Sequence, residues 1–443
     1  MNDHARKTAR LQTQFRAASG TVRLGKDTSN LFRDRKAPPA GRLDVRAFSE
    51  VLAVNPETGT VDVEGMTPYS RLVDATLSHA LVPAVVPQLR SITIGGAVSG
   101  VGIESSSFKY GLVHETVQEL EVLTGTGEIV VCRPDNEHQD LFHGFPNSYG
   151  TLGYALRVRA RTVPVKRYVH LDHTRHTDAG AFFADIAARA GGTADFLDGV
   201  VFAPDEMVVT TGRFADSAPY ASDYSYEHIY YRSLRERNED YLTTRDYLWR
   251  WDTDWFWCSK NVGAQHPLLR RLYGRKRLNS VTYTQIMRWN ARVGLTRRVN
   301  RLLGIHAESV IQDVDIPLER AAEFLEFFLR EVGIRPVWIC PIGHPAGRAR
   351  FPLYPIGRDR LYVNFGFWDV VRSRTPHAPG HFNRLVEDKV EALGGIKSLY
   401  SESFYDEERF WRLYDGPTYR QLKARYDPDG RFPDLYRKCV LRA

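Results

Sequence analysis

The sequence predicts an α+β fold, because strand-like runs dominate its first 165 residues and no regular alternation of strand and helix suggests a parallel sheet. Two predicted hairpins, VLAVNPETGTVDVEG (51–65) and LEVLTGTGEIVVCRP (120–134), turn at glycine-containing loops. The segment LGYALRVRART (152–162) alternates apolar residues with Arg157, Arg159 and Arg161, the pattern of a strand with one buried face. These patterns predict a first domain over residues 1–165.

A helix is predicted after the first hairpin, with Thr67 as N-cap and Pro68 at its first position. The second domain, residues 166–415, contains a third hairpin at 195–214 and a tyrosine- and arginine-rich stretch, 226–257, that we expect to be helical. PLERAAEFLEFFLREVG (317–333) is an amphipathic helix, and RPVWICPI and LYVNFGFW are strands. This order predicts a sheet backed by helices, and residues 416–443 form a segment that returns to the first domain.

Composition limits the class of protein. The chain has 443 residues, 43% of them hydrophobic and 26% charged, which suits a globular protein of two domains. Its formal charge of +7 suits anionic lipids, phosphorylated cofactors or nucleic acid and does not choose among them. The four cysteines lie far apart, as expected for reduced thiols in a cytoplasmic protein.

The chain shows no sign of membrane insertion. It has no apolar run of about 18 residues, and residues 1–20 lack the apolar stretch of a secretory signal. We therefore expect a cytoplasmic protein, with peripheral contact at the inner face of the membrane left open. Basic residues flank Leu11 and Phe15, a weak membrane-surface pattern, but a solvated terminus is the favoured interpretation.

The strongest functional signal is ITIGGAVSGVGIESSSFKYG (92–111), in which five glycines lie among small residues and three consecutive serines. Bare backbone and hydroxyl groups can approach a pyrophosphate closely. Glycine-rich turns between strands are also common, so composition alone does not distinguish a ligand-binding loop from a structural turn. Neither GxxxxGK[ST] nor a GxGxxG that opens a helix is present, which excludes a P-loop and a Rossmann site.

The segments 95–132 and 140–162 resemble the FAD-binding domain of the vanillyl-alcohol-oxidase (PCMH-type) superfamily. GIESSSFKYG (102–111) is particularly similar to the Delta-24 sterol reductase (Diminuto-like) subfamily, and the similarity continues through 246–260, 310–319, 335–342, 399–416 and 432–438. The resemblance implies a bipartite FAD-binding domain and a substrate, or cap, domain.

The resemblance also implies where FAD is bound. The first loop, VRLGKDTSN (22–30), implies phosphate contacts, the glycine-rich loop implies a second set, and the terminal FPDLYRK implies a segment beside the flavin. The implied cofactor residues are Arg23, Gly25, Lys26, Ser29, Thr93, Gly95, Gly96, Gly100, Gly102, Ile103, Glu104, Ser105, Ser106, Gly150, Thr151, Gly153, Tyr154, Tyr436 and Lys438.

One departure from the superfamily is informative. Many of its oxidases tether FAD through a histidine in the first loop, but residues 17–50 contain no histidine, and no cysteine lies near residues 100–110. We therefore expect noncovalent FAD. The same departure argues, less strongly, against an oxidase that uses oxygen.

The subfamily implies NADPH as hydride source, FAD as relay and an isolated carbon–carbon double bond as acceptor. Such an alkene needs a proton donor in a dry pocket, and aromatic faces ease the developing positive charge. The candidate donors are His306, Glu308, Tyr400, Glu402 and Tyr405. As a set, the aromatic residues would line a lipid tunnel, although each alone is more typical of a core; they are Trp249, Trp251, Trp255, Phe256, Trp257, Tyr400, Phe404, Tyr405 and Trp411.

The favoured substrate is a membrane phospholipid acyl chain with a 10-methylene branch, which becomes a 10-methyl (tuberculostearic-type) chain. The arginine- and alanine-rich composition looks actinobacterial. Bacteria of that group contain related enzymes that reduce such a methylene branch. The alternatives are a Delta-24 sterol side-chain reductase and an FAD-dependent sugar or alcohol oxidase on the same scaffold.

Two further classes are disfavoured. His170, His173 and His176 lack a fourth ligand, so we expect an exposed turn and no metal site. The stretch IYYRSLRERNEDYL mixes aromatic residues with arginine, but acidic residues interrupt it and no RNA- or DNA-binding motif is present, so we expect no nucleic-acid partner. The sequence leaves the oligomeric state open.

Overall fold

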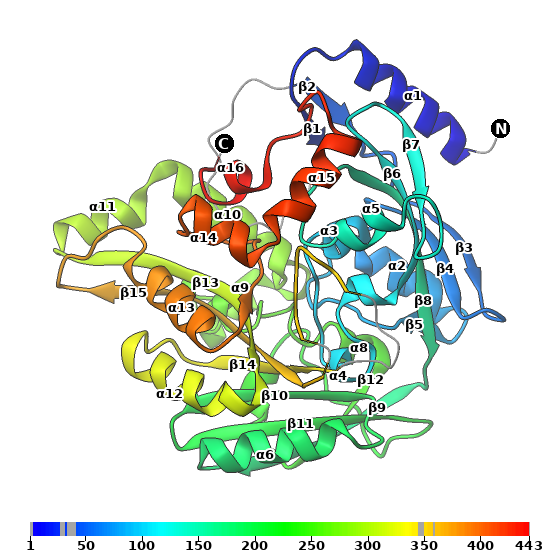
Figure 1. The fold of residues 1–443 in the computed structure, drawn as a ribbon. Coiled ribbons are helices and arrows are strands. Elements are labelled where there is room, and N and C mark those ends of the chain that lie inside the picture. Colours follow the sequence, from blue (N-terminus) through cyan, green and yellow to red (C-terminus); the bar gives the residue numbers. More distant parts are fainter. Residues whose placement is uncertain (1–2, 27–31, 33–40, 344–349, 358, 443) are drawn as a thin grey trace.

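The computed structural model describes residues 3–26, 32, 41–343, 350–357 and 359–442. These form two large antiparallel sheets and one two-stranded parallel sheet, with helices around them (Figure 1). This arrangement confirms the predicted α+β class. The first sheet has the order β3-β4-β8-β6-β7, and β5 pairs with one end of β8. Its strands are β3 (Val51–Asn55), β4 (Thr60–Glu64), β5 (Leu81–Pro83), β6 (Val117–Leu123), β7 (Ile129–Cys132) and β8 (Tyr154–Pro164).

Both hairpins predicted for this part of the chain are present as β3–β4 and β6–β7. The predicted helix begins one residue late, because Pro68 rather than Thr67 is the N-cap residue. The helices of this part are α2 (Tyr69–Leu77), α3 (Ile94–Ser99), α4 (Ser107–Tyr110), the 3-10 helix η1 (Val113–Thr116) and α5 (Gln139–Gly144).

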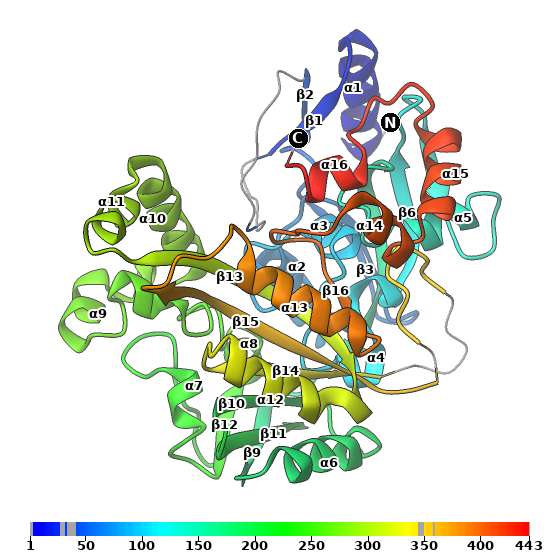
Figure 2. The same ribbon diagram turned by 60° about the vertical axis from the view of Figure 1, so that its left-hand side comes forward.

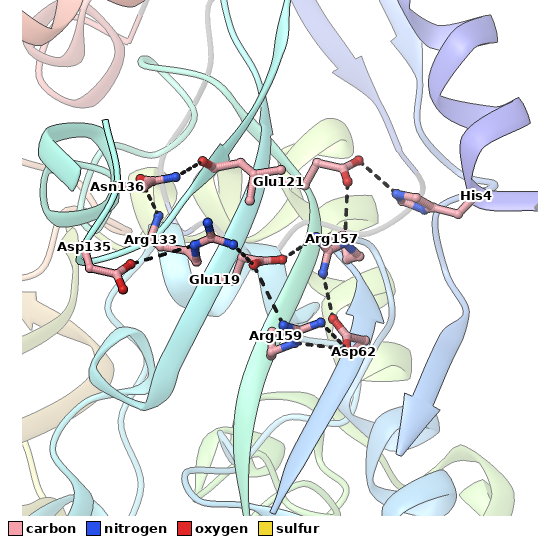
Figure 3. A network of polar contacts seen from close by, with 10 residues as sticks. His4, Asp62, Glu119, Glu121, Arg133, Asp135, Asn136, Arg157 and Arg159 are labelled. Atoms are coloured by element: carbon pink, nitrogen blue, oxygen red, sulfur yellow. Dashed lines mark hydrogen bonds and ion pairs between the residues drawn. The ribbon is translucent and has the colours of Figure 1, made fainter. Parts of the chain in front are cut away.

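The alternation predicted for β8 is confirmed, and its arginine face carries a network of charges (Figure 3). Arg157 forms ion pairs with Asp62 on β4 and with Glu119 and Glu121 on β6, and Arg159 shares Asp62 at 3.0 Å. The opposite charges come from both neighbouring strands, so cross-strand pairing holds the central strand of the sheet in register.

The N-terminal helix α1 (Asp3–Ala17) is packed against the protein, so the predicted solvated terminus is wrong. Leu11 and Phe15 are buried, and the ring of His4 bonds to the carboxylates of Glu64 (2.8 Å) and Glu121 (2.9 Å). These hydrogen bonds to Glu121 and Glu64 raise the pKa of His4 to about 9. Beside this helix, β1 (Val22–Gly25) and β2 (Gly41–Asp44) form a parallel pair.

The second sheet has the order β12-β9-β11-β10-β14-β15-β13-β16 in the described residues. Three helices cover its outer face, and their apolar residues form a core with that face (Figures 1 and 2). Its strands are β9 (Tyr168–His176), β10 (Phe196–Ala203), β11 (Glu206–Ala215), β12 (Glu239–Thr243), β13 (His306–Pro317), β14 (Val337–Ile342), β15 (Tyr362–Ser373) and β16 (Ile396–Lys397). The helices are α6 (Ala179–Ala190), η4 (Leu318–Arg320) with α12 (Ala321–Glu331), and α13 (His381–Ala392).

The prediction of a helical stretch over 226–257 is largely wrong. This stretch contains the short helices α7 (Tyr230–Ser233) and α8 (Thr244–Leu248) with the strand β12 between them, followed by turns. Helical structure is concentrated instead in the next segment. It comprises η2 (Cys258–Val262), α9 (Pro267–Tyr273), η3 (Arg275–Arg277), α10 (Ser280–Val293) and α11 (Leu295–Leu302).

The C-terminal helices lie against the first sheet's side of the molecule (Figure 1). They are α14 (Glu407–Leu413), α15 (Gly416–Tyr426) and α16 (Leu435–Cys439). The side chain of Lys423 donates to the carbonyl of Thr151, and the N–H of Val22 donates to the carbonyl of Arg431. None of the helices in the described part of the chain combines the length and apolar composition that a bilayer crossing needs.

Candidate functional site

A cavity of about 720 Å³ lies between the glycine-rich segment and the inner face of the second sheet. Most of the predicted cofactor residues lie in its wall. These residues are Arg23, Gly25, Lys26, Thr93, Gly95, Gly96, Gly100, Gly102, Ile103, Gly150, Gly153, Tyr154 and Lys438. Its volume falls within the range of small-molecule sites.

One end of the cavity is basic. Arg23 on β1 and Arg42 on β2 are register partners, so the parallel pairing presents both side chains on one face. Lys26, the residue after the end of β1, also lines the cavity. Sequence reasoning missed Arg42, because the parallel partner of β1 was not foreseen. Cations beside bare backbone form the donor set that a pyrophosphate requires, so this end fits FAD.

Side chains at Gly100, Gly150 and Gly153 would clash with neighbouring atoms or strain the backbone. A Cβ at Gly100 would lie 2.9 Å from the carbonyl oxygen of Gly96, and one at Gly153 would lie 2.5 Å from a methyl group of Val122. Gly150 has a φ of +74°, which L residues rarely adopt. This part of the wall is therefore closely packed backbone without side chains, which a ligand in the cavity can approach.

Three predicted cofactor residues face away from the cavity. Glu104 forms a buried ion pair with Arg250 (2.8 Å), and Ser105 contacts the hydroxyl of Tyr247 (3.0 Å). Ser106 donates to the carbonyl of Ala84. The physical reason is that the buried guanidinium of Arg250 needs polar partners, which Glu104 and Ser105 provide, while Ser106 satisfies a backbone carbonyl.

The remaining predicted cofactor residues are placed as follows. Thr151 is buried and donates to the carbonyl of Ser148, and Tyr436 donates to the carbonyl of Tyr405, so neither lines the cavity. Lys438 lines it and also donates to the carbonyl of Tyr149. Ser29 lies outside the described residues.

The other end of the cavity is aromatic. Trp255, Phe256, Trp368 and Tyr400 line it; Phe256 and Trp368 have ring centroids 4.3 Å apart, and the indole of Trp368 donates to the hydroxyl of Tyr400 (2.8 Å). Trp255 and Phe256 have φ values of +45° and +58°, a strained conformation for bulky residues. Such strain is typical of positions that the surrounding structure fixes for function.

Only part of the predicted aromatic tunnel lies in the cavity wall. Trp255, Phe256 and Tyr400 do, and Trp368 was missed. The others pack elsewhere; they are Trp249, Trp251, Trp257, Phe404, Tyr405 and Trp411.

Two aspartates of β13 also line the cavity, and sequence reasoning missed both. Asp313 and Asp315 are two residues apart, so the pleat presents both on one face. Burial raises the pKa of Asp313 to about 8, with a further contribution from the charge of Asp315. Asp313 also bonds to the hydroxyl of Tyr400, and its Oδ1 atom is shielded from solvent with no hydrogen-bond partner among the described residues.

Asp315 is held more firmly than Asp313. It accepts hydrogen bonds from the hydroxyl of Tyr354 and the amide of Asn364, both at 2.7 Å. Burial raises the pKa of Asp315 to about 6. At neutral pH the pair therefore consists of an ionised, fixed carboxylate and a protonated one that faces the cavity, an arrangement that can donate a proton.

Most of the proton donors predicted from the sequence lie away from this cavity. His306 and Glu308 are at the opposite, outer end of β13, about 15–25 Å along the strand from Asp313. Glu308 accepts from the amide of Asn383, and Glu402 pairs with Arg442. Of the five candidates, Tyr400 is the one in the cavity wall.

The histidines considered for a metal lie on β9, not in a turn. His173 is buried and bonds to Thr210, His170 stacks on Tyr241, and His176 contacts Asp185. Among the described residues, no group of three or more potential ligands could hold a metal ion.

Comparison with known proteins defines the class. Residues 21–133 match the family described as FAD binding domain (FAD_binding_4), the segment that supplies the basic and glycine-rich end of the cavity. This part of the chain is therefore an FAD binding domain.

Over most of its length the chain is similar to Delta(24)-sterol reductases. It is 28% identical to the protein of Homo sapiens, with 89% of this chain and 77% of the relative covered. The corresponding values for Arabidopsis thaliana are 28%, 89% and 76%. Cytokinin dehydrogenase 9 of Oryza sativa subsp. japonica is 29% identical over 34% of this chain and 30% of the relative. Together with the domain match, these relatives support an FAD-dependent oxidoreductase.

Proposed function

We propose that this protein uses FAD and NADPH to reduce an isolated carbon–carbon double bond in a lipid, with a 10-methylene fatty acyl chain as favoured substrate. The observation that carries the proposal is the cavity itself. It runs from cationic side chains and bare glycine backbone to an aromatic wall that contains a protonated carboxyl group. A flavin nucleotide and an apolar acceptor can share such a space.

The chain's own residues provide the proton. Asp313 donates from its carboxyl group to one alkene carbon, the adjacent carbon takes up hydride, and the carboxylate regains a proton from solvent. The bound FAD supplies the hydride-transfer chemistry, and NADPH is the proposed external two-electron donor. Burial, with a further contribution from the negative charge of Asp315, keeps Asp313 protonated, and the hydroxyl of Tyr400 orients its carboxyl group.

The aromatic wall has two roles in this proposal. It excludes water, which preserves the high pKa of Asp313, and its ring faces stabilise positive charge that develops on the more substituted carbon. Trp255, Phe256 and Trp368 are the rings placed to do so.

FAD is proposed to be held without a covalent bond. Among the described residues that line the cavity, none is a histidine or a cysteine, the residues that tether flavin in related oxidases. Contacts from Arg23, Lys26 and Arg42 would hold the phosphates instead.

The substrate is proposed on chemical grounds. Protonation of a methylene branch or of a sterol side-chain alkene gives the same tertiary cationic centre, so one donor serves both. The names of the similar reductases favour the sterol as second candidate. The arginine- and alanine-rich composition favours the acyl chain.

The test starts with the purified chain. It should be yellow and release FAD on acid precipitation, and NADPH should bleach it under anaerobic conditions. A phospholipid with a 10-methylene chain should then restore the colour, whereas a sterol with a side-chain double bond should not. A colourless protein that takes up no FAD would overturn the proposal, as would oxidation of a polyol by oxygen without NADPH. Reoxidation by the sterol alone would establish the second candidate.

A further inference from the structure

The segment from residue 266 to residue 305, here called the helical lobe, has an unusual charge. It contains ten lysine and arginine residues and no aspartate or glutamate. The whole chain carries a formal charge of +7, so the rest of the protein is net negative. The basic character noted in the sequence therefore belongs to this one lobe.

The same lobe exposes most of the protein's unpartnered apolar side chains. Of the eleven large apolar residues that are exposed in the described part of the chain, eight lie here, and Trp289 and Leu272 are 58% and 77% exposed. The eight are Leu268, Leu269, Leu272, Val281, Trp289, Val293, Leu302 and Leu303. So large an apolar cluster marks an interaction surface.

The helices place these residues together. Figure 2 shows α9, α10 and α11 gathered on one flank of the molecule, beyond the ends of β13 and β15. Along α10, Val281, Trp289 and Val293 are separated by multiples of four residues, so they lie on one side of that helix. Leu268 and Leu272 are related in the same way on α9.

Basic side chains accompany the apolar ones. Arg271, Lys276, Arg277 and Arg298 are exposed, and no ion pair joins them to an acidic side chain among the described residues. Arginine and lysine beside exposed leucine and tryptophan are typical of surfaces that bind the interface of an anionic bilayer.

The lobe also reaches the cavity. Arg288 on α10 lines the cavity wall, and the next residue, Trp289, is exposed. A lipid that leaves a bilayer beneath the lobe would therefore meet the cavity directly. This link rests on the proposed lipid substrate, whereas the charge and exposure of the lobe do not.

We infer that the helical lobe docks on the surface of an anionic lipid bilayer, with its leucines and Trp289 in the interface and its basic side chains among the headgroups. Other occupants fit less well. A second copy of the lobe would bring like charges together, and nucleic acid would leave eight apolar side chains in water.

The test is binding of the full-length protein to vesicles, measured by flotation without any turnover. Vesicles with 30% phosphatidylglycerol in phosphatidylcholine should bind the protein, pure phosphatidylcholine vesicles should bind it far less, and added salt should weaken binding. The double variant K276Q/R277Q should lower the partition coefficient about 30-fold, at about fivefold for each basic residue. The double variant L272S/W289S should lower it by at least tenfold.

Matched controls separate docking from general charge and from turnover. R16Q/R420Q removes two exposed charges outside the lobe, and L52S removes an exposed leucine elsewhere, so both should bind as the wild type does. Equal binding of wild type and lobe variants would overturn the inference, as would lobe variants that alter self-association or nucleic-acid binding but not vesicle binding. If vesicles bind while no lipid is reduced, the proposed function fails and the docking surface stands.

Discussion

Replacing Asp313 by asparagine tests the proposed proton donor most directly. The substitution keeps the shape and the hydrogen bond to Tyr400 but removes the transferable proton. General acid catalysis contributes roughly 100- to 10,000-fold, so the rate of substrate reduction should fall by at least about 100-fold. Reduction of the flavin by NADPH should be nearly unchanged, because no alkene is protonated in that half-reaction.

The pH dependence gives a second readout. Because burial raises the pKa of Asp313 to about 8, wild-type activity should fall as the pH rises through 8, and the Asp313→Asn variant should lose that alkaline limb. The pKa of Asp313 is higher in the folded protein than the 3.8 expected in the unfolded chain. Its contribution to the free energy of unfolding is therefore complete below pH 3.8 and is lost as the pH rises towards 8. The loss is up to roughly 6 kcal/mol, and the variant should escape it, so it should unfold at a higher temperature than the wild type at pH 9.

The assay is stopped-flow measurement of flavin reduction and reoxidation from pH 6 to pH 10. The control is Glu308→Gln, a change of the same kind on the same strand but at its outer end, which should leave both half-reactions unchanged. The reasoning is refuted if Asp313→Asn reduces the lipid at the wild-type rate with its alkaline limb intact, or if Glu308→Gln shows the loss instead.

Three further predictions concern the structure around the site. Gly366→Ala should slow lipid reduction with FAD retained, since a Cβ there would lie 2.4 Å from the ring of Trp368; flavin content and steady-state rates measure this. His4→Gln should detach α1 from the first sheet. Because the pKa of His4 is raised, its contribution to the packing of α1 is complete below pH 6.5 and is lost as the pH rises through 9. Proteolysis of the wild-type N-terminus should therefore accelerate above pH 9, and that of the variant should be rapid throughout. Arg250→Met should lower the free energy of unfolding by about 3–5 kcal/mol, because two buried carboxylates lose their partner; chemical denaturation measures the loss.

Local sequence pattern predicted the first sheet well. The alternation along β8 is a period-two signal that any half-buried strand produces, and the hairpin turns are set by nearby residues. The glycine-rich wall was predictable for a related reason. Glycine positions can be read from the sequence directly, and the family resemblance then implied Gly95, Gly96, Gly100 and Gly102 as cofactor residues before any contact was known.

The proposed proton donor, Asp313, and its neighbour Asp315 were not predictable in this way. In VIQDVDIP the two aspartates alternate with apolar residues, a pattern that normally describes a strand with its polar face in water. Their burial depends on β15, which pairs with β13 from more than 45 residues away and carries Trp368. His306 and Glu308 belong to the same strand but lie at its exposed end, an odd number of residues from Asp313, so the pleat places them on the face opposite the cavity.

The serines of the glycine-rich loop show a different limit. Ser105 and Ser106 were predicted to donate to phosphate, and their hydroxyls face the other way. Ser105 lies beside Arg250, which belongs to a stretch predicted to be helical and is buried between Glu104 and Asp198, whereas Ser106 bonds to the backbone of Ala84. A pairing across 146 residues leaves no periodic signal in the sequence.

That pairing also links the two ends of the site. Glu104 belongs to the glycine-rich segment and Asp198 to β10 of the second sheet, and one guanidinium binds both at 2.8 and 2.9 Å. The segment therefore presents glycine backbone to the cavity on one side and fixes the second sheet on the other. The position of β13, two strands from β14 and three from β10, follows from this junction. The buried ion pair therefore joins the segment that forms the glycine-rich wall to the sheet that carries Asp313, which gives this charged cluster a structural role in the site.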